Sequence, residues 1–308
     1  MDLSLKEQLI WLQLQQVSYR DCWHYLRYAL QTKSYTTTLS LSACQELLQE
    51  VRQQSGALQA DHIGFEAAHG YEGQVRNLAK QALLLGEKAY PALWLEIPKP
   101  PLLMYYRGDL SLLSRPLISI VGTRSMTEYG YHDATLLTQT LNRLGLVCVS
   151  GMALGVDACV HQTALEQLNG KTVAIVASGL NHCYPKQHLG LYEQLANQQL
   201  VLSEYLPNTP VRKHHFIMRN RLVAGIAPAL VVIEAAVKSG SLITANYALQ
   251  YNREVYACPG HLSQRMSAGC NQLLQAGAIP IYHVASFIEE VKELYQVQGF
   301  LAKHDGGK

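Results

Sequence analysis

Two patterns of apolar positions divide the chain. Up to about residue 85, apolar residues recur at spacings of three and four, as in LKEQLIWLQLQ and ACQELLQEVRQQ, which is typical of amphipathic helices. From Leu117 onward, short runs rich in β-branched residues alternate with helical stretches. Nearly continuous apolar strands between helices predict a parallel sheet that is covered on both faces. We therefore expect an α/β fold with a mostly parallel, doubly wound sheet, preceded by a small helical domain.

This change of pattern predicts how the chain is divided. We expect a small helical domain at residues 1–85, a connector at 86–112, an α/β domain at 113–300 and a tail at 301–308. The connector contains YPALWLEIPKPPLLMYYRGDL, whose prolines prevent a regular helix. The tail is expected to be disordered.

The composition is that of an ordinary soluble globular protein. Hydrophobic residues make up 48% of the chain and charged residues 16%, and no apolar run reaches the roughly 18 residues that a membrane span needs. The start of the chain lacks the pattern of a signal peptide. Seven cysteines are scattered without a CxxC pair, which is typical of reduced thiols and not of a zinc site. We therefore expect a cytoplasmic protein without a metal, a cofactor or a membrane partner.

The expected strands end in turns that are rich in glycine and serine. LISIV runs into GTRS, LVCVS into GMALGVD, TVAIVA into SGLNHCYP, ALVVIEA into VKSGSLIT and EVYAC into PGH. Open α/β sheets bind ligands at the carboxyl ends of their strands, where the unpaired amides at helix starts attract anions. One such turn would reflect turn chemistry alone. Five turns on one edge of a sheet predict a rim that binds anions.

The usual nucleotide-binding and hydrolase motifs are absent. The nearest approach to a P-loop is Gly170-Lys171-Thr172, but Leu165 stands where that motif needs a glycine. GMALG does not match the dinucleotide fingerprint GxGxxG, and the chain contains no GxSxG nucleophile turn. Ser203-Glu204 and His161 have no visible catalytic partner and are expected to be structural.

Positive charge gathers around one phenylalanine. No Asp or Glu occurs from Leu206 to Ile233, although the formal net charge of the whole chain is only +2. Within this stretch, RKHHFIMRNR places Phe216 among cations, a pattern typical of single-stranded nucleic-acid binding, and Lys213 is expected to attract the strand. Arg124, in the turn GTRS, is a candidate phosphate clamp because its planar guanidinium matches phosphate oxygens. A solvated basic face and a core position for Phe216 remain alternatives.

Helical geometry separates the two arginines of this stretch. Arg219 and Arg221 diverge by roughly 200° around a helix, so both cannot face DNA equally. Phe216 and Arg219 are three positions apart and can share a face. We expect Phe216 and Arg219 to contact DNA. Arg221 is expected to pair inward, with Glu204 or Glu234.

Long, ordered motifs from about Tyr90 to Ala278 resemble those of a known family. They include ISIVGTRSMTEYG, VSGMALGVDACVH, TVAIVASGLNHCYP and FIMRNRLVAGIAPALVVIEAAVKSGSLITA. The chain resembles the bacterial DNA-processing protein A (Smf) family. The resemblance implies an extended Rossmann-like fold that binds single-stranded DNA and loads the RecA recombinase, in natural transformation and recombination. It also implies a homodimer and a role that is not enzymatic.

The DNA-binding residues are predicted from the resemblance, from the turn that follows ALVVIEA and, for Lys213, from the basic stretch itself. They are Gly122, Thr123, Arg124, Lys213, Phe216, Arg219, Asn220, Arg221, Ser239, Gly240, Ser241 and Thr244. The chain departs from the family pattern at Ile217, where proline is usual, and in VGTR, where VGSR is commoner. The resemblance implies that the helical N-terminal region is a divergent form of the family's sterile-alpha-motif-like domain. We expect no C-terminal winged-helix domain, which many relatives carry.

Two further alternatives concern activity and assembly. Related Rossmann-like folds hydrolyse nucleoside monophosphates, and Glu234 with Arg124 could serve as acid and phosphate clamp, although the PGGxGTxxE turn of that class is absent. The segment ASFIEEVKELY carries an apolar helical face. This face either forms a dimer interface or packs onto the chain's own sheet, and its residues are Phe287, Ile288, Val291 and Leu294.

Overall fold

The computed structural model describes residues 2–32, 38–54 and 71–297. The chain forms two compact units, the first from residues 1–87 with 101–105 and the second from residues 88–100 with 106–308. The tail expected at 301–308 lies outside the described residues. No helix in the described ranges is both long and apolar enough to cross a bilayer.

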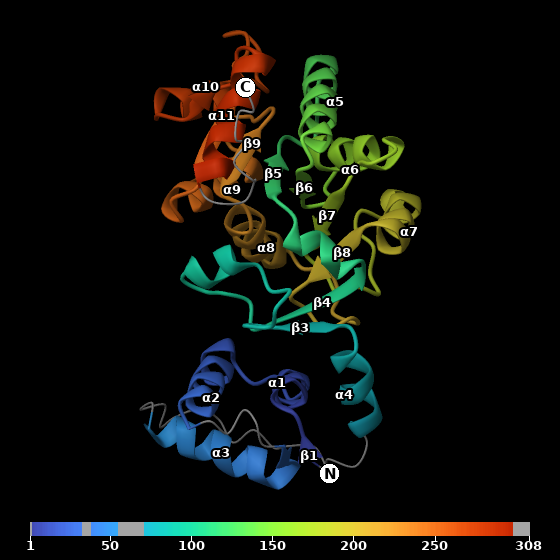
Figure 1. Cartoon of the computed structure of the whole chain (residues 1–308), viewed down its shortest axis with the longest axis vertical. Coiled ribbons are helices and arrows are strands. Elements are labelled where there is room, and N and C mark those ends of the chain that lie inside the picture. The colour runs from blue at the N-terminus through green and yellow to red at the C-terminus, as the bar shows by residue number, and fades with distance from the viewer. Residues whose placement is uncertain (1, 33–37, 55–70, 298–308) are drawn as a thin grey trace, which may run out of the picture. The chain divides into compact units, whose positions relative to one another are not determined.

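The first unit is mainly helical, as its amphipathic pattern predicts (Figure 1). α1 begins at Ser4, whose hydroxyl accepts a hydrogen bond from the amide of Glu7, while the Glu7 carboxylate accepts one from the amide of Ser4. α1 packs against α4, and α2 packs against α3. Two short antiparallel strand pairs, β1 with β2 and β3 with β4, were not predicted. The elements are β1 (Asp2–Leu3), α1 (Leu5–Leu14), α2 (Tyr19–Gln31), β2 (Leu39–Ser40), α3 (Leu41–Gln54), α4 (Glu72–Ala79), β3 (Ala82–Leu84) and the first part of β4 (Leu103–Gly108).

The second unit contains a parallel sheet, and the predicted α/β class is confirmed. Every apolar run expected to be a strand forms one. Its helices are the 3-10 helices η3 (Ala92–Glu96), η4 (Leu110–Ser114) and η5 (Lys186–His188), and α5 (Glu128–Arg143), α6 (Val156–Glu166), α7 (Leu189–Gln198), α8 (Lys213–Gly225), α9 (Gly240–Gln250), α10 (Ala268–Gln275) and α11 (Val284–Val297). Its strands are β5 (Leu117–Val121), β6 (Val147–Ser150), β7 (Thr172–Ile175), β8 (Leu200–Ser203), β9 (Ala229–Val232), β10 (Glu254–Ala257) and β11 (Ile279–Pro280).

Residues 92–96 of the proline-rich connector are held within the second unit by polar contacts. The indole N–H of Trp94 donates to the carbonyl of Leu222 at 2.9 Å. Arg253, from the loop before β10, donates to the Glu96 carboxylate at 2.7 Å and to the Leu93 carbonyl at 2.9 Å. These bonds fix η3 beside α8 without a regular helix, as the prolines require.

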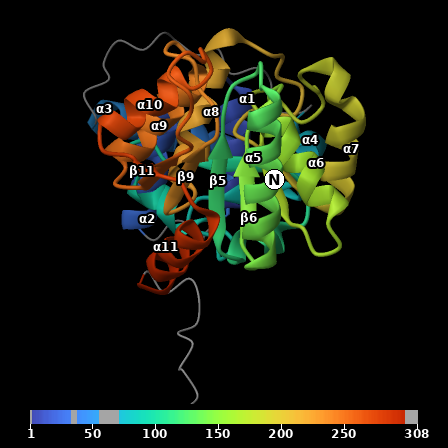
Figure 2. The same cartoon turned by 90° about the horizontal axis from the view of Figure 1, so that it is seen from above.

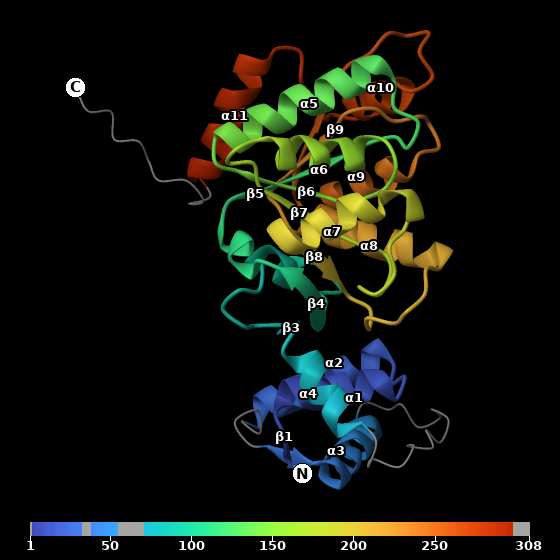
Figure 3. The same cartoon turned by 90° about the vertical axis from the view of Figure 1, so that its right-hand side faces the viewer.

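Helices cover both faces of the parallel sheet. α5, α6 and α7 lie along one face (Figure 3), where the core cluster includes Ile118 and Leu137. α8 and α9 cover the opposite face, and the buried hydroxyl of Ser119 on β5 donates to the Val223 carbonyl of α8 at 2.6 Å. Both faces of β5 are therefore occupied, which explains why LISIV is apolar throughout except at Ser119.

α11 packs onto the chain's own sheet. Phe287 and Val291 are buried in the same core cluster as β5 and α5, and Phe287 meets Tyr256 of β10 edge-on at 5.1 Å between ring centroids. Leu294 is partly buried against this cluster, and Ile288 is half-exposed. Of the two readings of this helical face, packing onto the sheet is the one observed. The low exposure of Phe287 and Val291 leaves these two side chains unavailable for a dimer interface.

The strand order creates one point at which the chain reverses direction across the sheet. The parallel strands follow the order β11-β10-β9-β5-β6-β7-β8, and Figure 2 shows β5 between β6 and β9. The chain runs from β5 through β6 and β7 to β8, then returns to pair β9 with the other side of β5. Loops that follow β5 and β9 leave the sheet in opposite directions. Such a switch point opens a crevice at the carboxyl ends of the two strands.

Candidate nucleic-acid interface

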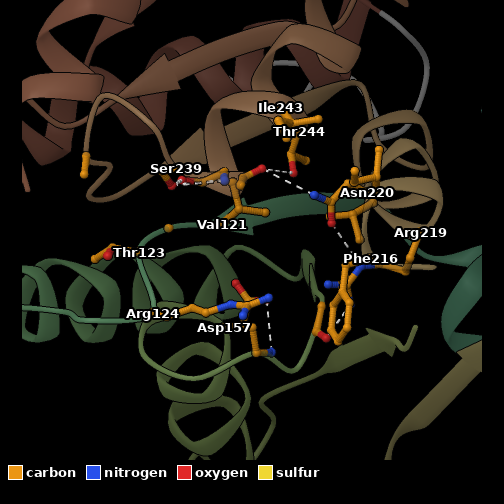
Figure 4. A pocket seen from close by; sticks show the side chains of 18 of the residues that line it. Val121, Thr123, Arg124, Asp157, Phe216, Arg219, Asn220, Ser239, Ile243 and Thr244 are labelled. Atoms are coloured by element: carbon orange, nitrogen blue, oxygen red, sulfur yellow. Dashed lines mark hydrogen bonds between the residues drawn. The ribbon is translucent and has the colours of Figure 1, made fainter. Parts of the chain in front are cut away.

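A pocket of about 360 Å³ opens at this switch point (Figure 4). Its walls come from the loops after β5, β6 and β9 and from the helices α8 and α9. Arg124, Arg219 and Lys238 line it, together with a single carboxylate, Asp157. Positive charge therefore predominates, and the volume falls in the range of about 300 to 1,000 Å³ that is usual for ligand sites.

The loop after β5 presents Arg124 to solvent from a fixed backbone. The Thr123 amide donates to the Glu234 carbonyl at 2.7 Å, and the Thr123 carbonyl accepts from the Val156 amide at 3.2 Å. A Cβ on Gly122 would come within 2.5 Å of the Val156 side chain, so this close approach of loop and helix requires glycine. The Arg124 side chain is exposed and extends towards α8 (Figure 4).

The first turns of α8 form the facing wall. Phe216 is half-buried, and the guanidinium carbon of Arg124 lies 5.3 Å from the centroid of its ring. This is the geometry of a cation–π pair. A cation and an aromatic ring from two separate elements thus meet at the pocket.

The start of α9 completes the pocket. The Ser239 hydroxyl caps the helix by accepting from the amide of Ser241 at 3.1 Å. Asn220 of α8 donates to the Gly240 carbonyl at 3.3 Å, and the hydroxyl of Thr244 donates to the same carbonyl at 3.3 Å. Asn220 therefore joins α8 to α9 and fixes the width of the pocket.

Comparison with known proteins identifies the family. The family model of DNA recombination-mediator protein A matches residues 81–292. The chain belongs to this family. DNA processing protein DprA of Bacillus subtilis is 40% identical to it over 211 residues, which are 68% of this chain and 70% of that protein. Protein Smf of Escherichia coli is 34% identical over 204 residues, which are 66% of this chain and 54% of that protein.

Solved structures of two DNA processing proteins share the fold. The X-ray structure of DNA processing protein A from Streptococcus pneumoniae aligns with a TM-score of 0.77 and 29% identity, over 94% of this chain and 99% of that one. The protein from Helicobacter pylori aligns with a TM-score of 0.63 and 31% identity, over 69% of this chain and 96% of that one. The latter structure describes the single-stranded DNA binding mode of that protein.

The structure brings most of the predicted DNA-binding residues to this pocket. Lys213, on the first turn of α8, and Arg221 do not line it. The predicted residues that do line it are Gly122, Thr123, Arg124, Phe216, Arg219, Asn220, Ser239, Gly240, Ser241 and Thr244. Residues from three distant parts of the sequence therefore converge on one site.

Arg219 lines the pocket but is more deeply buried than an exposed DNA contact would be. Only 5% of its surface is accessible, and its guanidinium donates to the carbonyls of Gly151 and Ile175. A Cβ on Gly151 would collide with this guanidinium. Burial lowers the pKa of Arg219, and the nearby Asp157 carboxylate acts in the opposite direction. Arg219 thus ties α8 to the ends of β6 and β7.

Arg221 points away from the pocket, as helical geometry predicts. Its guanidinium donates to both carboxylate oxygens of Glu204, at 2.6 Å to Oε2, and to the Lys99 carbonyl at 2.6 Å. The side chains of Arg221 and Glu204 are only 4% and 18% exposed. This ion pair joins α8 to the loop after β8. Its geometry supports a structural role for Arg221.

Glu234 has a capping role. Its carboxylate is buried and accepts from the Thr127 amide at 2.9 Å and from the Thr127 hydroxyl at 2.6 Å. Thr127 in turn caps α5 by accepting from the amide of Gly130. Glu234 does not line the pocket, so it is not paired there with Arg124 as the hydrolase alternative requires.

Two charged residues of the pocket were not singled out from the sequence. Lys238 lies in the turn VKSGS, and Asp157 ends the stretch GMALGVD and lies on the first turn of α6. Asp157 accepts from the Ala153 amide at 3.2 Å, and burial raises the pKa of its carboxyl while Arg219 lowers it. Their only sequence signal was membership of turns at strand ends. Within residues 2–32, 38–54 and 71–297, no cluster of three His, Cys, Asp or Glu side chains could hold a metal ion.

Proposed function

We propose that this pocket binds single-stranded DNA without reading base edges, and so without requiring a particular sequence, and without catalysis. The observation that carries the proposal is the contact between Arg124 and Phe216 at the switch point. A guanidinium suits a backbone phosphate, and a half-buried aromatic ring at the pocket suits any base, since every base has a π-face. Membership of the DNA recombination-mediator protein A family supports the same function, as does the DNA-binding relative from Helicobacter pylori.

The chemistry of the pocket favours single strands over duplex. Cations, helix-start amides and an aromatic ring recognise a backbone and a base face, but they do not form a row of donors and acceptors for base edges. In a duplex the bases are stacked and paired, so they cannot reach Phe216. The duplex should therefore retain only the phosphate contacts.

Affinity measured against salt concentration tests this function. Fluorescence anisotropy of labelled thymidine, cytidine and mixed pyrimidine oligomers should give similar affinities that fall steeply with salt, with about 0.7 in the logarithmic slope per phosphate contact. Duplex of the same length should bind more weakly. A flat salt response, or equal binding of duplex, would contradict the proposal.

We further propose that the DNA-bound protein loads the RecA recombinase, in recombination and natural transformation, and that it acts in the cytoplasm as a homodimer. Family membership is the support for these steps. On single-stranded DNA that is already coated with single-strand-binding protein, ATP hydrolysis by RecA should begin after a lag, and adding this protein should shorten that lag. Sedimentation at micromolar concentration should show a dimer. An unchanged lag would contradict the proposed loading of RecA, and a monomer in sedimentation would contradict the proposed homodimer.

A further inference from the structure

A second aromatic ring stands beside Phe216. Tyr184 meets Phe216 with 5.4 Å between ring centroids and 65° between ring planes. Tyr184 comes from the loop between β7 and α7, whereas Phe216 comes from α8. Although its ring touches Phe216, the tyrosine is 46% exposed. Its accessible face is therefore not accounted for by core packing.

The loop that carries Tyr184 is held by hydrogen bonds on both sides. Within it, the Ser178 hydroxyl donates to the His182 carbonyl at 2.8 Å. The amide of Gly179 donates to the carbonyl of Thr209, and that of Asn181 to the carbonyl of Pro207, both at 2.9 Å. These bonds fasten the loop after β7 to the loop after β8. Tyr184 is thus presented from a fixed backbone, and little ordering entropy is lost when a ligand binds.

We propose that Tyr184 and Phe216 together receive two consecutive bases of single-stranded DNA in an unstacked arrangement. This inference rests on the proposed function and names how the strand is held. Two bases that stack on rings inclined by 65° cannot remain parallel to each other, so the strand must bend between them. Arg124, whose guanidinium lies over Phe216, is placed beside this bend and would meet the phosphate that links the two bases.

This arrangement has a free-energy cost of binding that depends on how strongly neighbouring bases of the strand stack on each other. It does not depend on the hydrogen-bonding edges of the bases. A run of adenines is strongly stacked in solution and must be unstacked to enter, whereas a run of thymines is nearly unstacked already. Preferences of this kind arise from stacking strength and backbone flexibility. Wild-type protein should therefore bind a thymidine oligomer more tightly than an adenosine oligomer of equal length, with the same salt slope for both.

Tyr184→Ala tests the second ring. On a thymidine oligomer the variant should lose affinity about tenfold, with an unchanged salt slope because no charge is removed. On an oligomer of abasic sites, which keeps the phosphates but has no bases, Tyr184→Ala should bind as wild type does. Tyr184→Phe should bind the thymidine oligomer like wild type. Tyr251→Ala serves as the matched control, because Tyr251 is also partly exposed and paired with another ring, Tyr247, at the far end of α9.

The results separate this inference from the function on which it rests. If wild type fails to bind any thymidine oligomer, the proposed function itself is wrong. If wild type binds and Phe216→Ala weakens binding while Tyr184→Ala does not, only the second ring is wrong. An equal loss for Tyr184→Ala on thymidine and abasic oligomers would make Tyr184 a structural residue. Equal affinity of wild type for adenosine and thymidine oligomers would overturn the unstacked arrangement without relying on any variant.

Discussion

The guanidinium of Arg124 and the ring of Phe216 form a cation–π pair across the pocket, 5.3 Å from carbon to ring centroid. One comes from the loop after β5 and the other from α8. Each side chain therefore restricts the other before DNA is present. Restraint of this kind reduces the entropy that binding must remove.

The contact predicts that the two residues do not act independently. Arg124→Ala and Phe216→Ala should each weaken binding of single-stranded DNA, and the double variant should lose less than both losses added, with a coupling of about 0.5–1 kcal/mol. The salt slope should fall by about 0.7 for Arg124→Ala and stay constant for Phe216→Ala. Arg143→Ala, at the exposed far end of α5, is the charge-matched control. Strict additivity would show that the pair is not formed in solution.

Arg219 should matter for stability as well as for binding. Arg219→Ala leaves the carbonyls of Gly151 and Ile175 without their donor and leaves Asp157 without a neighbouring cation. We expect a loss of about 1–3 kcal/mol in the free energy of unfolding, measured by urea denaturation. An Arg219→Ala variant that is as stable as wild type, and whose logarithmic salt slope falls by about 0.7, would show that Arg219 is an exposed phosphate ligand.

Breaking the Arg221–Glu204 pair should destabilise the fold without changing the number of phosphate contacts to DNA. Arg221→Ala removes the guanidinium from which the largely buried Glu204 carboxylate accepts, at a cost of about 1–3 kcal/mol. Replacing both residues with leucine should recover much of this loss, because the buried carboxylate is then removed as well. Folded Arg221→Ala protein, assayed below its melting temperature, should keep the wild-type salt slope. If binding is abolished in a variant as stable as wild type, Arg221 contacts DNA directly.

His161 predicts a loss of stability in mild acid. Its Nδ1 lies 2.7 Å from the Thr172 hydroxyl, which itself donates to the Cys148 carbonyl, so Nδ1 carries a proton and donates to Thr172. Burial lowers the pKa of His161 to about 3. The unfolded chain therefore binds more protons below pH 6.5, and stability falls from there towards pH 3, by about 2 kcal/mol at pH 5.

His161→Asn is the test of this titration. Asparagine keeps the donor to Thr172 but cannot be protonated in this range. The variant should be less stable than wild type at neutral pH, yet its free energy of unfolding should change less between pH 7 and pH 5. Parallel pH profiles for the two proteins would show that His161 is not the responsible group.

The sequence predicted correctly those features that depend on a single helix or strand. Apolar runs gave the parallel strands, and helical spacing correctly placed Phe216 and Arg219 on the pocket side of α8 and Arg221 away from it. Helical spacing predicts the direction in which a side chain leaves the helix, but it does not predict which element that side chain meets. The burial of Arg219 against the ends of β6 and β7 was therefore not predicted. The same limit left open whether Phe287 and Val291 would face the sheet or a partner.

Contacts that depend on loop geometry could not be predicted. Tyr184 and Phe216 are adjacent only because the loops after β7 and β8 are bonded together. Asp157 and Lys238 carry no signal that distinguishes them from other turn residues until the order of the strands is known. That order depends on the pairing of β5 with β9, which periodicity does not encode.

The position of β9 next to β5 also constrains when the pocket can exist during synthesis. Ser119 pairs with Leu230, about 110 residues later in the chain, and pairings between such distant segments form slowly. A nascent chain that has emerged from the ribosome only as far as α8 already carries Arg124 and Phe216, but β5 is then an open edge strand and α9 has not been made. The pocket is therefore completed only when late residues reach the earliest parallel strand, and until then the unpaired edge of β5 is exposed to misassociation.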